Sequence, residues 1–340
     1  MKNKIEFREF KKEENLVRIQ KLFEACYGDV PLFKGGKYPS LKELEWRYLK
    51  CQIKSKIFVA EDIEKRIIVG IRPILLKKIK VNDSEGLGAQ FMDVMVHPAY
   101  RGRGIFTKLM KMAYDYLKKE NILVAYTFPN RNSYPAYKKV TDWQELSFFK
   151  VFVNIQNIFW SPKLEVDQDV NIETIENFDE RVNLLLEKFL NLYDICIYRT
   201  SEYLNWRFIR RPDVEYKIIS VNRGEKLVGY AVLRTRKLFT SKVGLIIELV
   251  CDPEYYNVFE MLIKHSLKEF KNLGVKWVLF FNFSNKNFEV LLRKNHFFQF
   301  SLFQNIRKIP LVIKPISKDL KIGSINLGNW YISLGDNDAV

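Results

Sequence analysis

Cysteine, histidine, glycine and proline are all scarce in this chain of 340 residues, with 4 Cys, 3 His, 15 Gly and 11 Pro. The cysteines are scattered without Cys-x-x-Cys spacing, which in a chain of this length indicates reduced thiols and excludes a disulfide framework or a zinc site. The histidines lie far apart and support neither a metal site nor a catalytic triad. The low glycine and proline content, without a long polar tract, excludes a disordered or fibrous protein.

Long apolar runs are missing as well. No stretch approaches the roughly 20 apolar residues that cross a bilayer. The first ten residues are charged and lack the apolar segment of a secretory signal. We therefore expect a cytoplasmic protein that has no membrane span and no metal.

Positive charge is abundant, because 56 Lys and Arg residues against 40 Asp and Glu residues give a net charge of +16. This charge attracts polyanions such as nucleic acid, anionic lipid or CoA, but solvated lysine faces would explain it equally well. Zinc-knuckle spacing, an RNP-like aromatic signature and a dense basic block are all absent, so a nucleic-acid partner is not expected. The oligomeric state is left open.

The two halves of the chain repeat one pattern. A helical segment with Trp-Arg-aromatic recurs, and its arginines, Arg47 and Arg207, are 160 positions apart. A charged turn and a glycine-bearing strand follow each copy, and the glycines, Gly70 and Gly229, are 159 positions apart. Because 340 residues exceed the size of a single core, this register indicates a duplicated domain.

The order of predicted elements is the same in both halves. Each half opens with a strand and a helix, and each later has an amphipathic helix followed by an apolar strand. The predicted elements are the strands 5–10, 122–128, 170–175 and 275–281 and the helices 15–26, 105–117 and 180–190. We predict an α/β (α+β) chain with two domains, 1–158 and 159–340, joined at a linker near Trp160–Lys163. Each domain is a mixed, mostly antiparallel twisted sheet flanked by helices.

The most informative segment runs from Met92 to Leu109 and reads as strand, turn, glycine-bearing loop and helix start. Gly102 and Gly104 lie in the loop, where unpaired N–H groups at a helix N-terminus can bind a pyrophosphate. Arg101 and Arg103 add charge-assisted donors.

This segment resembles motif A of the GNAT acyltransferase superfamily. Arg101 and Gly104 occupy the first two anchor positions, and Phe106 stands where the superfamily has Gly or Ala. The next strand leads to Asn130 and, seven residues later, Tyr137, as in the superfamily. The resemblance implies two GNAT-like domains in tandem, with acetyl-CoA as cosubstrate of the first.

The resemblance also implies which residues bind the donor. The CoA-binding residues are expected to be Val94, Met95, Val96, Arg101, Gly102, Arg103, Gly104, Ile105, Phe106, Asn130, Ser133 and Tyr137. Splayed strands would admit the pantetheine arm to the backbone of Met95 and Val96. Tyr137 would protonate the departing CoA thiolate.

A general base is needed because the attacking amine must be neutral. Asp93 is one candidate, and strand alternation places it on the face opposite Val94 and Val96. Alternatively, Asp93 only pairs with a cation or binds backbone groups.

The acidic C-terminus supplies another candidate base. The tandem arrangement resembles the enhanced-intracellular-survival aminoglycoside acetyltransferases, whose terminal carboxylate reaches the first domain's site. By this resemblance Asp336, Asp338 or the carboxylate of Val340 closes over the acceptor site. Alternatively, these residues form an ordinary frayed terminus.

The second half lacks the donor motif. The segment after Pro253 has neither glycine nor arginine, and Leu292 stands where the tyrosine is expected. We interpret this half as catalytically silent, forming an acceptor cleft or a scaffold. Since Trp-Arg-aromatic occurs in both halves, it is interpreted as packing.

The resulting hypothesis is an N-acyltransferase that passes acetyl from acetyl-CoA to a primary amine by direct attack in a ternary complex. Acceptors under consideration are an amino sugar, an aminoglycoside-like molecule, a polyamine and a peptide amine. The alternatives are transfer of longer acyl or aminoacyl groups, since the tandem arrangement also resembles enzymes of cell-wall peptide assembly, and a non-catalytic CoA-sensing or protein-binding module.

Overall fold

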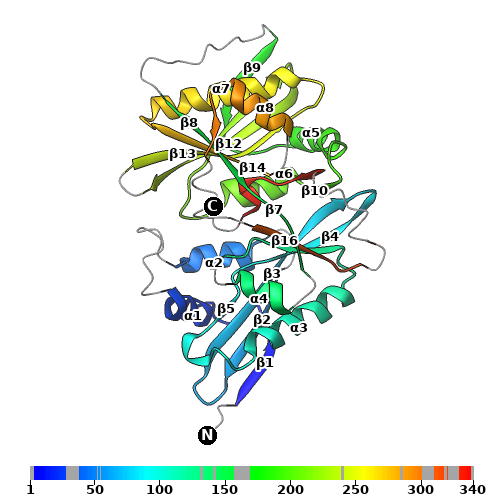
Figure 1. The fold of residues 1–340 in the computed structure, drawn as a ribbon, viewed down its shortest axis with the longest axis vertical. Coiled ribbons are helices and arrows are strands. Elements are labelled where there is room, and N and C mark those ends of the chain that lie inside the picture. Colours follow the sequence, from blue (N-terminus) through cyan, green and yellow to red (C-terminus); the bar gives the residue numbers. More distant parts are fainter. Residues whose placement is uncertain are drawn as a thin grey trace. The chain divides into compact units, whose positions relative to one another are not determined.

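The computed structural model describes residues 4–27, 38–51, 53, 55–130, 133–140, 143–156, 169–238, 241–283, 286–300, 310–317, 320 and 329–337. These residues belong to two compact units. The first unit takes its residues from Met1–Ile79, Glu85–Leu146 and Pro310–Ser324, and the second from Lys80–Ser84, Ser147–Ile309 and Ile325–Val340. Each unit is a mostly antiparallel sheet flanked by helices, so the predicted fold class is confirmed (Figure 1).

The sheet of the first unit has the strand order β1-β2-β3-β4-β6-β16-β7, with the short β5 paired to β3. Its strands are β1 (Ile5–Glu9), β2 (Lys56–Asp62), β3 (Ile67–Val81), β4 (Ser84–Phe91), β5 (Met95–Val96), β6 (Val124–Thr127), β7 (Gln144–Phe148) and β16 (Pro310–Pro315). Strands β1, β2 and β3 pair antiparallel, whereas β4 and β6 run parallel. Helices α1 (Val17–Tyr27) and α2 (Leu41–Tyr48) lie on one side of this sheet, and α3 (Ile105–Lys119) and α4 (Tyr134–Val140) lie on the other (Figure 1).

The sheet of the second unit has the order β15-β8-β14-β13-β12-β11-β9. Its strands are β8 (Lys150–Ile155), β9 (Val170–Ile175), β11 (Lys217–Arg223), β12 (Lys226–Leu238), β13 (Ser241–Cys251), β14 (Trp277–Asn282) and β15 (Phe298–Gln299). Only β13 and β14 among the described pairs of this sheet are parallel. The remaining elements are the helices α5 (Arg181–Leu190), α6 (Ser201–Leu204), α7 (Tyr256–Asn272) and α8 (Lys286–Lys294) and the parallel pair β10 (Ile195–Ile197) and β17 (Trp330–Tyr331).

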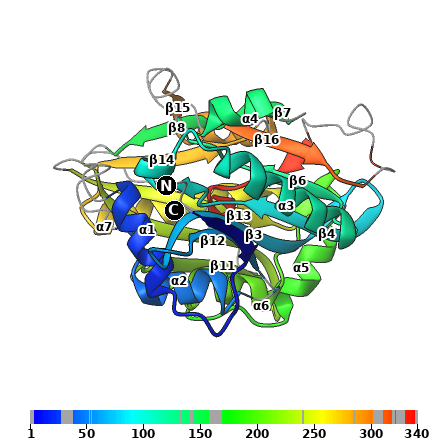
Figure 2. The same ribbon diagram turned by 90° about the horizontal axis from the view of Figure 1, so that it is seen from below.

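The two faces of the second sheet carry different elements. On β12, a Cβ atom added to Gly229 would lie 2.7 Å from Val258 of α7. The next residue, Tyr230, points to the other face, where its ring contacts that of Phe178. Helix α7 therefore covers one face, and Figure 2 shows α5 and α6 on the side of the strands away from α7.

The two units repeat each other element by element, which confirms the predicted duplication. Strands β1-β2-β3-β4-β6 correspond in order to β9-β11-β12-β13-β14. In both units a glycine at the same position of the sheet lets a helix pack closely against it. A Cβ atom on Gly70 would lie 2.8 Å from Ile105 of α3, just as one on Gly229 would crowd α7.

One strand is exchanged between the two halves of the chain. In the first sheet, β16 lies between β6 and β7, although it comes from the C-terminal part of the sequence. In the second sheet, β8 lies at the corresponding place between β14 and β15, although it follows β7 directly in the chain. The expected division near residue 158 describes the two sequence repeats, whereas the structural units take one strand each from the other repeat.

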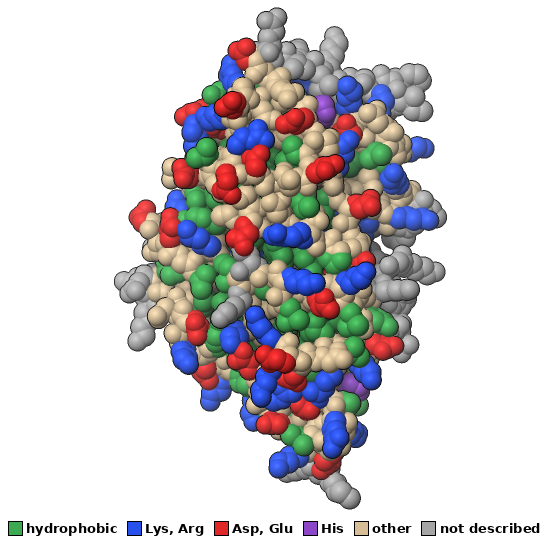
Figure 3. Space-filling view, turned by 180° about the vertical axis from the view of Figure 1, so that it is seen from behind, with side chains coloured by type: hydrophobic (Ala, Val, Ile, Leu, Met, Phe, Trp, Pro, Cys, Tyr) green, Lys and Arg blue, Asp and Glu red, His purple; other side chains and the backbone are tan. Residues whose placement is uncertain are grey.

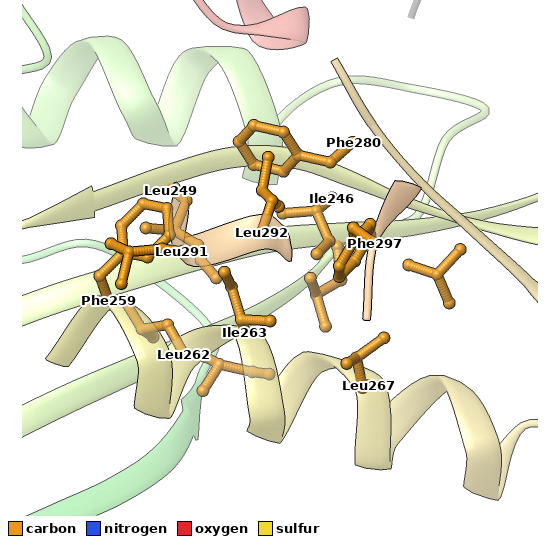
Figure 4. Close-up of a cluster of buried hydrophobic side chains, with 14 of the residues drawn as sticks. Ile246, Leu249, Phe259, Leu262, Ile263, Leu267, Phe280, Leu291, Leu292 and Phe297 are labelled. Carbon is orange, nitrogen blue, oxygen red and sulfur yellow. The ribbon is translucent and has the colours of Figure 1, made fainter. Parts of the chain in front are cut away.

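Each exchanged strand contributes to the core of its new unit. Val312 of β16 is buried in the apolar cluster of the first unit, and Phe152 of β8 is buried in that of the second. Figure 4 shows the second cluster, in which side chains of α7 and α8 pack together with Ile246 of β13. Since each buried side chain of this size contributes about 1.5–3 kcal/mol, losing the exchanged strand would weaken either core.

Halves cut at residue 158 are therefore expected not to fold separately. The piece 1–158 lacks β16 and would leave strand edges of β6 and β7 unpaired, which favours aggregation. Neither piece alone should show a cooperative thermal transition by circular dichroism, whereas co-expressed pieces should co-purify and melt together. A cooperative transition of 1–158 alone would contradict this expectation.

Candidate active site

A glycine-bearing loop joins β5 to α3 in the first unit. Gly102 and Gly104 have positive φ angles of 75° and 72°, in the left-handed region that favours glycine. A Cβ atom added to either residue would meet nothing within 4 Å, so the loop is open at both positions. Gly104 is the N-cap of α3, whose first backbone N–H groups have no partner inside the helix. The loop therefore offers N–H donors and a helix dipole to an anion.

Buried contacts hold this loop in place. Tyr100, which precedes the glycines, is buried, and its hydroxyl donates a 2.6 Å hydrogen bond to the buried carboxylate of Asp62. Ile105 begins α3 and is only 2% exposed, because it faces Gly70 of β3. Of the predicted CoA-binding residues, Ile105 thus has only its backbone available to a ligand.

Two arginines flank the loop glycines on the surface. Arg101 donates from Nε to the carbonyl oxygen of Val96 at 3.2 Å. Arg103 donates to the carbonyl of Ala99 at 3.2 Å, and its guanidinium lies 4.9 Å from the centre of the Tyr100 ring. A guanidinium has five N–H donors, so both side chains keep donors beyond these contacts. They place positive charge beside the open loop.

The strands next to the loop separate. The parallel pairing of β4 with β6 reaches as far as Gln90 and Tyr126, and among the described residues β5 pairs with β3 alone. The N–H of His97 donates to Val69 of β3 at 2.9 Å. Backbone groups of neighbouring strand residues point to opposite edges, so those of Val96 face away from β3. This is the edge at which the pantetheine arm was predicted.

Met95 and Val96 therefore differ in what they offer. Because the His97 N–H donates to Val69 of β3, alternation makes the backbone groups of Met95, which is paired with Ile71, face that strand as well. The carbonyl of Val96 faces the other way and lies 3.7 Å from the thiol of Cys26. Burial raises the pKa of the Cys26 thiol, although the nearby charge of Arg101 acts to lower it. At neutral pH the thiol is protonated, which argues against a nucleophilic role.

Asp93 lies at the break between β4 and β5, as does the half-buried Val94. Its φ angle is +44°, so it does not follow the strand alternation that the sequence pattern predicted. Its carboxylate accepts hydrogen bonds from Arg47 at 2.6 Å and from the Tyr48 hydroxyl at 2.7 Å. Arg47 also binds Glu43 at 2.6 Å. The cation pairing considered for Asp93 is present, and its role as a base remains a prediction.

Tyr137 lies on α4 and is 2% exposed. Its hydroxyl oxygen accepts a hydrogen bond of 2.8 Å from Nη1 of Arg72. Its ring meets those of Phe106 and Trp143 edge-on, with centroids 6.3 and 5.1 Å away. Phe106, the departure from the superfamily pattern, thus packs against the predicted general acid.

Arg72 is a fully buried cation at the centre of the first unit. Its guanidinium carbon lies 4.8 Å from the ring centre of Phe91 and 5.5 Å from those of Phe106 and Tyr137. It also donates to the sulfur of Met110, and within the described residues its Nε has no hydrogen-bond partner. A buried charge without a carboxylate partner costs several kcal/mol, so a role other than stability is indicated.

Asn130 and Ser133 build the start of α4. The side chain of Asn130 accepts from the Ser133 N–H at 3.0 Å, and the Ser133 hydroxyl accepts from the Asn130 N–H at 3.1 Å. These reciprocal bonds satisfy N–H groups at the helix start. Their observed contribution is to orient the helix that carries Tyr137.

Three of these residues were not predicted from the sequence. Arg47 and Tyr48 were interpreted as packing because their motif recurs in both halves, yet both contact Asp93. Arg72 was not singled out. The available signal was a single arginine in the otherwise apolar run from Ile67 to Leu76, where an isolated charge is costly.

Among the described residues, the second unit lacks counterparts of Arg72 and Tyr137. Strand register matches Gly70 with Gly229, which places Ala231 at the position of Arg72. Leu292, at the expected position of Tyr137, is fully buried in the core.

The loop before the matching helix is also changed in the second unit. Its length is counted from the strand residue paired with Gly70 or Gly229 to the helix residue that faces the same glycine. By this count it is two residues shorter than in the first unit. The carboxylate of Asp252 lies there, within 3.3 Å of Lys188 and Lys226. These lysines are therefore paired with a carboxylate of the protein itself.

Of the three C-terminal residues considered as the general base, the structure describes Asp336 alone. Asp336 is 2% exposed and pairs with Arg199 at 2.7 Å, inside the second unit. Asp338 and Val340 lie outside the described residues. The proposed function of the Val340 carboxylate remains a prediction.

Figure 3 shows Lys and Arg mixed with Asp and Glu over the visible face. Across the described ranges, no group of three or more His, Cys, Asp or Glu residues could hold a metal ion. None of the described helices is long and apolar enough to cross a membrane.

Comparison with known proteins agrees with this geometry. Residues 6–144 match the family model of the acetyltransferase (GNAT) domain. No curated protein matches the sequence. A conserved protein of Enterococcus faecalis V583, a probable N-acyltransferase, is 14% identical with a TM-score of 0.68, over 92% of this chain and 73% of that one.

Two further solved structures share the fold of nearly the whole chain. The tandem GNAT protein from the clavulanic acid biosynthesis pathway is 12% identical, with a TM-score of 0.60 over 93% of this chain and 100% of that one. Saccharomyces cerevisiae N-myristoyltransferase with bound myristoyl-CoA is also 12% identical, with a TM-score of 0.61 over 92% and 78%. The first half of the protein therefore carries a GNAT acetyltransferase domain, and the chain as a whole has the fold of tandem GNAT proteins.

Proposed function

We propose that the first unit transfers an acyl group, most simply acetyl, from acyl-CoA to a primary amine by direct attack in a ternary complex. One observation carries the proposal. The glycine loop and the Arg72–Tyr137 contact occur together in the first unit, and both are missing from the second. Two features with no sequence connection are lost together when a shared function is lost.

The residues of the first unit fit the donor. Positive φ angles at Gly102 and Gly104, with no atom within 4 Å of an added Cβ, leave backbone donors open to the pyrophosphate. Arg101 and Arg103 supply positive charge beside it. The backbone N–H of Val96 faces away from β3, toward the edge where the pantetheine arm is expected, whereas its carbonyl already accepts from Arg101.

In the chemical step the amine nitrogen attacks the thioester carbonyl carbon, a C–N bond forms, and the C–S bond breaks. Asp93 takes the proton that the ammonium form must lose, and the second proton, lost from nitrogen as the amide forms, returns to the tyrosine that has protonated the sulfur. The hydrogen bond from the Tyr48 hydroxyl, at 2.7 Å, holds the carboxylate in place. The carboxylate of Val340 remains a second candidate for this task.

Tyr137 gives its proton to the sulfur that leaves. Because Arg72 donates to the hydroxyl oxygen, the tyrosine's own proton must point away from Arg72. Arg72 is thus a positioning residue for the general acid.

Longer acyl groups are the second candidate function, because one solved structure of the same fold is named with myristoyl-CoA bound. The test measures binding and turnover with acyl-CoAs of 2 to 14 carbons and a mixture of amines, using release of free CoA as the readout. The highest kcat/KM at two carbons supports acetyl transfer, and a maximum at longer chains supports the alternative. Tight binding without turnover of any donor would indicate a CoA-sensing module. A cytoplasmic location likewise remains a prediction.

A further inference from the structure

The C-terminal segment of the second unit is held as a ligand would be. Residues 330–337 are buried, and Ser333 and Gly335 lie beside the carboxylate of Glu248. The Ser333 hydroxyl donates to Oε2 of Glu248 at 2.9 Å. Arg207 donates to the main-chain carbonyls of Gly335 at 2.9 Å and Asn337 at 3.2 Å.

Glu248 occupies the place that Asp93 has in the first unit. Val96 pairs with Gly70, and Cys251 pairs with the matching glycine, Gly229. Asp93 lies three residues before Val96, and Glu248 lies three residues before Cys251. Register therefore equates the two carboxylates.

Arg207 likewise occupies the place of Arg47. Each arginine follows, by seven residues, a hydroxyl residue that caps its helix: Ser40 accepts from the N–H of Glu43, and Thr200 accepts from that of Tyr203. In the first unit the arginine contacts the carboxylate directly, at 2.6 Å. In the second unit, Glu248 and Arg207 instead both bind the C-terminal segment described above.

The polypeptide between the two groups is bound mainly through its backbone. A Cβ atom added to Gly335 would lie 2.7 Å from Oε2 of Glu248 and 2.9 Å from Phe208, so the place admits only main chain there. The Ser333 hydroxyl supplies a polar hydrogen to the carboxylate, and carbonyls two and four residues later supply acceptors to the arginine. A peptide could offer the same groups to the first unit, whereas neither an amino sugar nor a polyamine carries such a row of carbonyls.

We infer that the acceptor of the first unit is the N-terminal amine of a peptide, which enters between Arg47 and Asp93. The amine takes the place that the Ser333 hydroxyl has at Glu248, and Arg47 leaves Asp93 to bind carbonyls of the third and fifth residues. Glu43, 2.6 Å from Arg47, keeps that cation paired when the contact with Asp93 opens. A glycine is favoured at the third position, as Gly335 is in the second unit. This inference rests on the proposed function.

The first test uses the full-length protein with acetyl-CoA and two pentapeptide libraries, which have Gly or Val at the third position and random residues elsewhere. Glucosamine and spermidine are the competing amines, and N-terminally blocked peptides are the control. Free CoA and peptide mass are measured. We expect kcat/KM for the Gly library to exceed that for the Val library and the small amines by about tenfold or more, a difference of 1.4 kcal/mol.

The outcomes separate the inference from the proposed function. Turnover of glucosamine or spermidine without the peptides overturns the inference and leaves the acyltransferase intact. Binding of acetyl-CoA without turnover of any peptide also overturns it. Failure to bind any acyl-CoA would contradict the proposed function itself.

The second test uses Arg47→Lys, because lysine keeps the charge but lacks the planar fork that binds two carbonyls. The peptide KM should rise about tenfold, while the KM for acetyl-CoA and the melting temperature stay the same. A change confined to the KM for acetyl-CoA would place Arg47 at the donor and overturn the inference.

Discussion

Gly104→Glu is expected to weaken acyl-CoA binding by more than about 100-fold, or 2.7 kcal/mol. The new carboxylate would stand at the N-terminus of α3, beside the backbone donors and where the pyrophosphate charge is expected. Like charges at this distance repel. No atom lies within 4 Å of the added Cβ, so the loss would not come from a steric clash inside the protein. Calorimetric titration with acetyl-CoA measures the effect.

Gly274→Glu is the matched control. Gly274 has a φ of +67° and open space around its Cβ position, but it lies between α7 and β14 of the second unit. Both variants introduce a non-glycine residue at positive φ, which costs roughly 1–2 kcal/mol of stability. The melting temperature should fall similarly in both, and only Gly104→Glu should lose binding. Equal loss of binding in both variants would show that backbone strain, not the donor site, is responsible.

Tyr137→Phe is expected to lower kcat by about 10²–10⁴-fold, the usual contribution of a general acid. Arg72→Met should lower kcat by about tenfold or more, because the hydroxyl loses the donor that directs its proton. If both act through one proton transfer, adding Arg72→Met to Tyr137→Phe should cost little further activity. Steady-state release of CoA by the four proteins of this cycle measures the coupling.

Stability distinguishes this function of Arg72 from a structural one. Methionine is apolar and of similar length, and it removes a buried charge that has no carboxylate partner among the described residues. Replacement of a buried ion by a well-packed apolar residue is commonly neutral or stabilising. The melting temperature of Arg72→Met should therefore match or exceed that of the parent. Additive losses of activity, or a large fall in melting temperature, would contradict the proposal.

Much of the fold could be predicted from sequence periodicity. The expected strand 170–175 is observed as β9 (Val170–Ile175), and the expected helix 105–117 is observed as α3 (Ile105–Lys119). These elements have one clear apolar face, so local pattern decides them. The left-handed backbone of Asp93 could not be predicted, because alternation assumes an unbroken strand.

The strand exchange could not be predicted from local sequence patterns either. Strands β8 and β16 are both short and apolar, and nothing in either sequence says which sheet it joins. Partner choice depends on contacts between residues more than 100 positions apart, such as Val312 with Thr127. In the same way, the contact of Arg72 with Tyr137 depends on two elements 65 residues apart. The donor loop could be predicted because all of its parts are adjacent in sequence.

The position of β16 in the sequence determines when the first unit can complete its sheet during translation. The donor loop and Tyr137 are synthesised within the first 140 residues, but the sheet that supports them is incomplete until Pro315 has emerged. At 5–20 residues per second, translation from β7 to the end of β16 takes roughly 10 to 35 seconds. During this time the nascent first unit exposes an unpaired strand edge at β6. The growing chain is thus exposed to aggregation for about half of its synthesis, and a chaperone is expected to bind it during this interval.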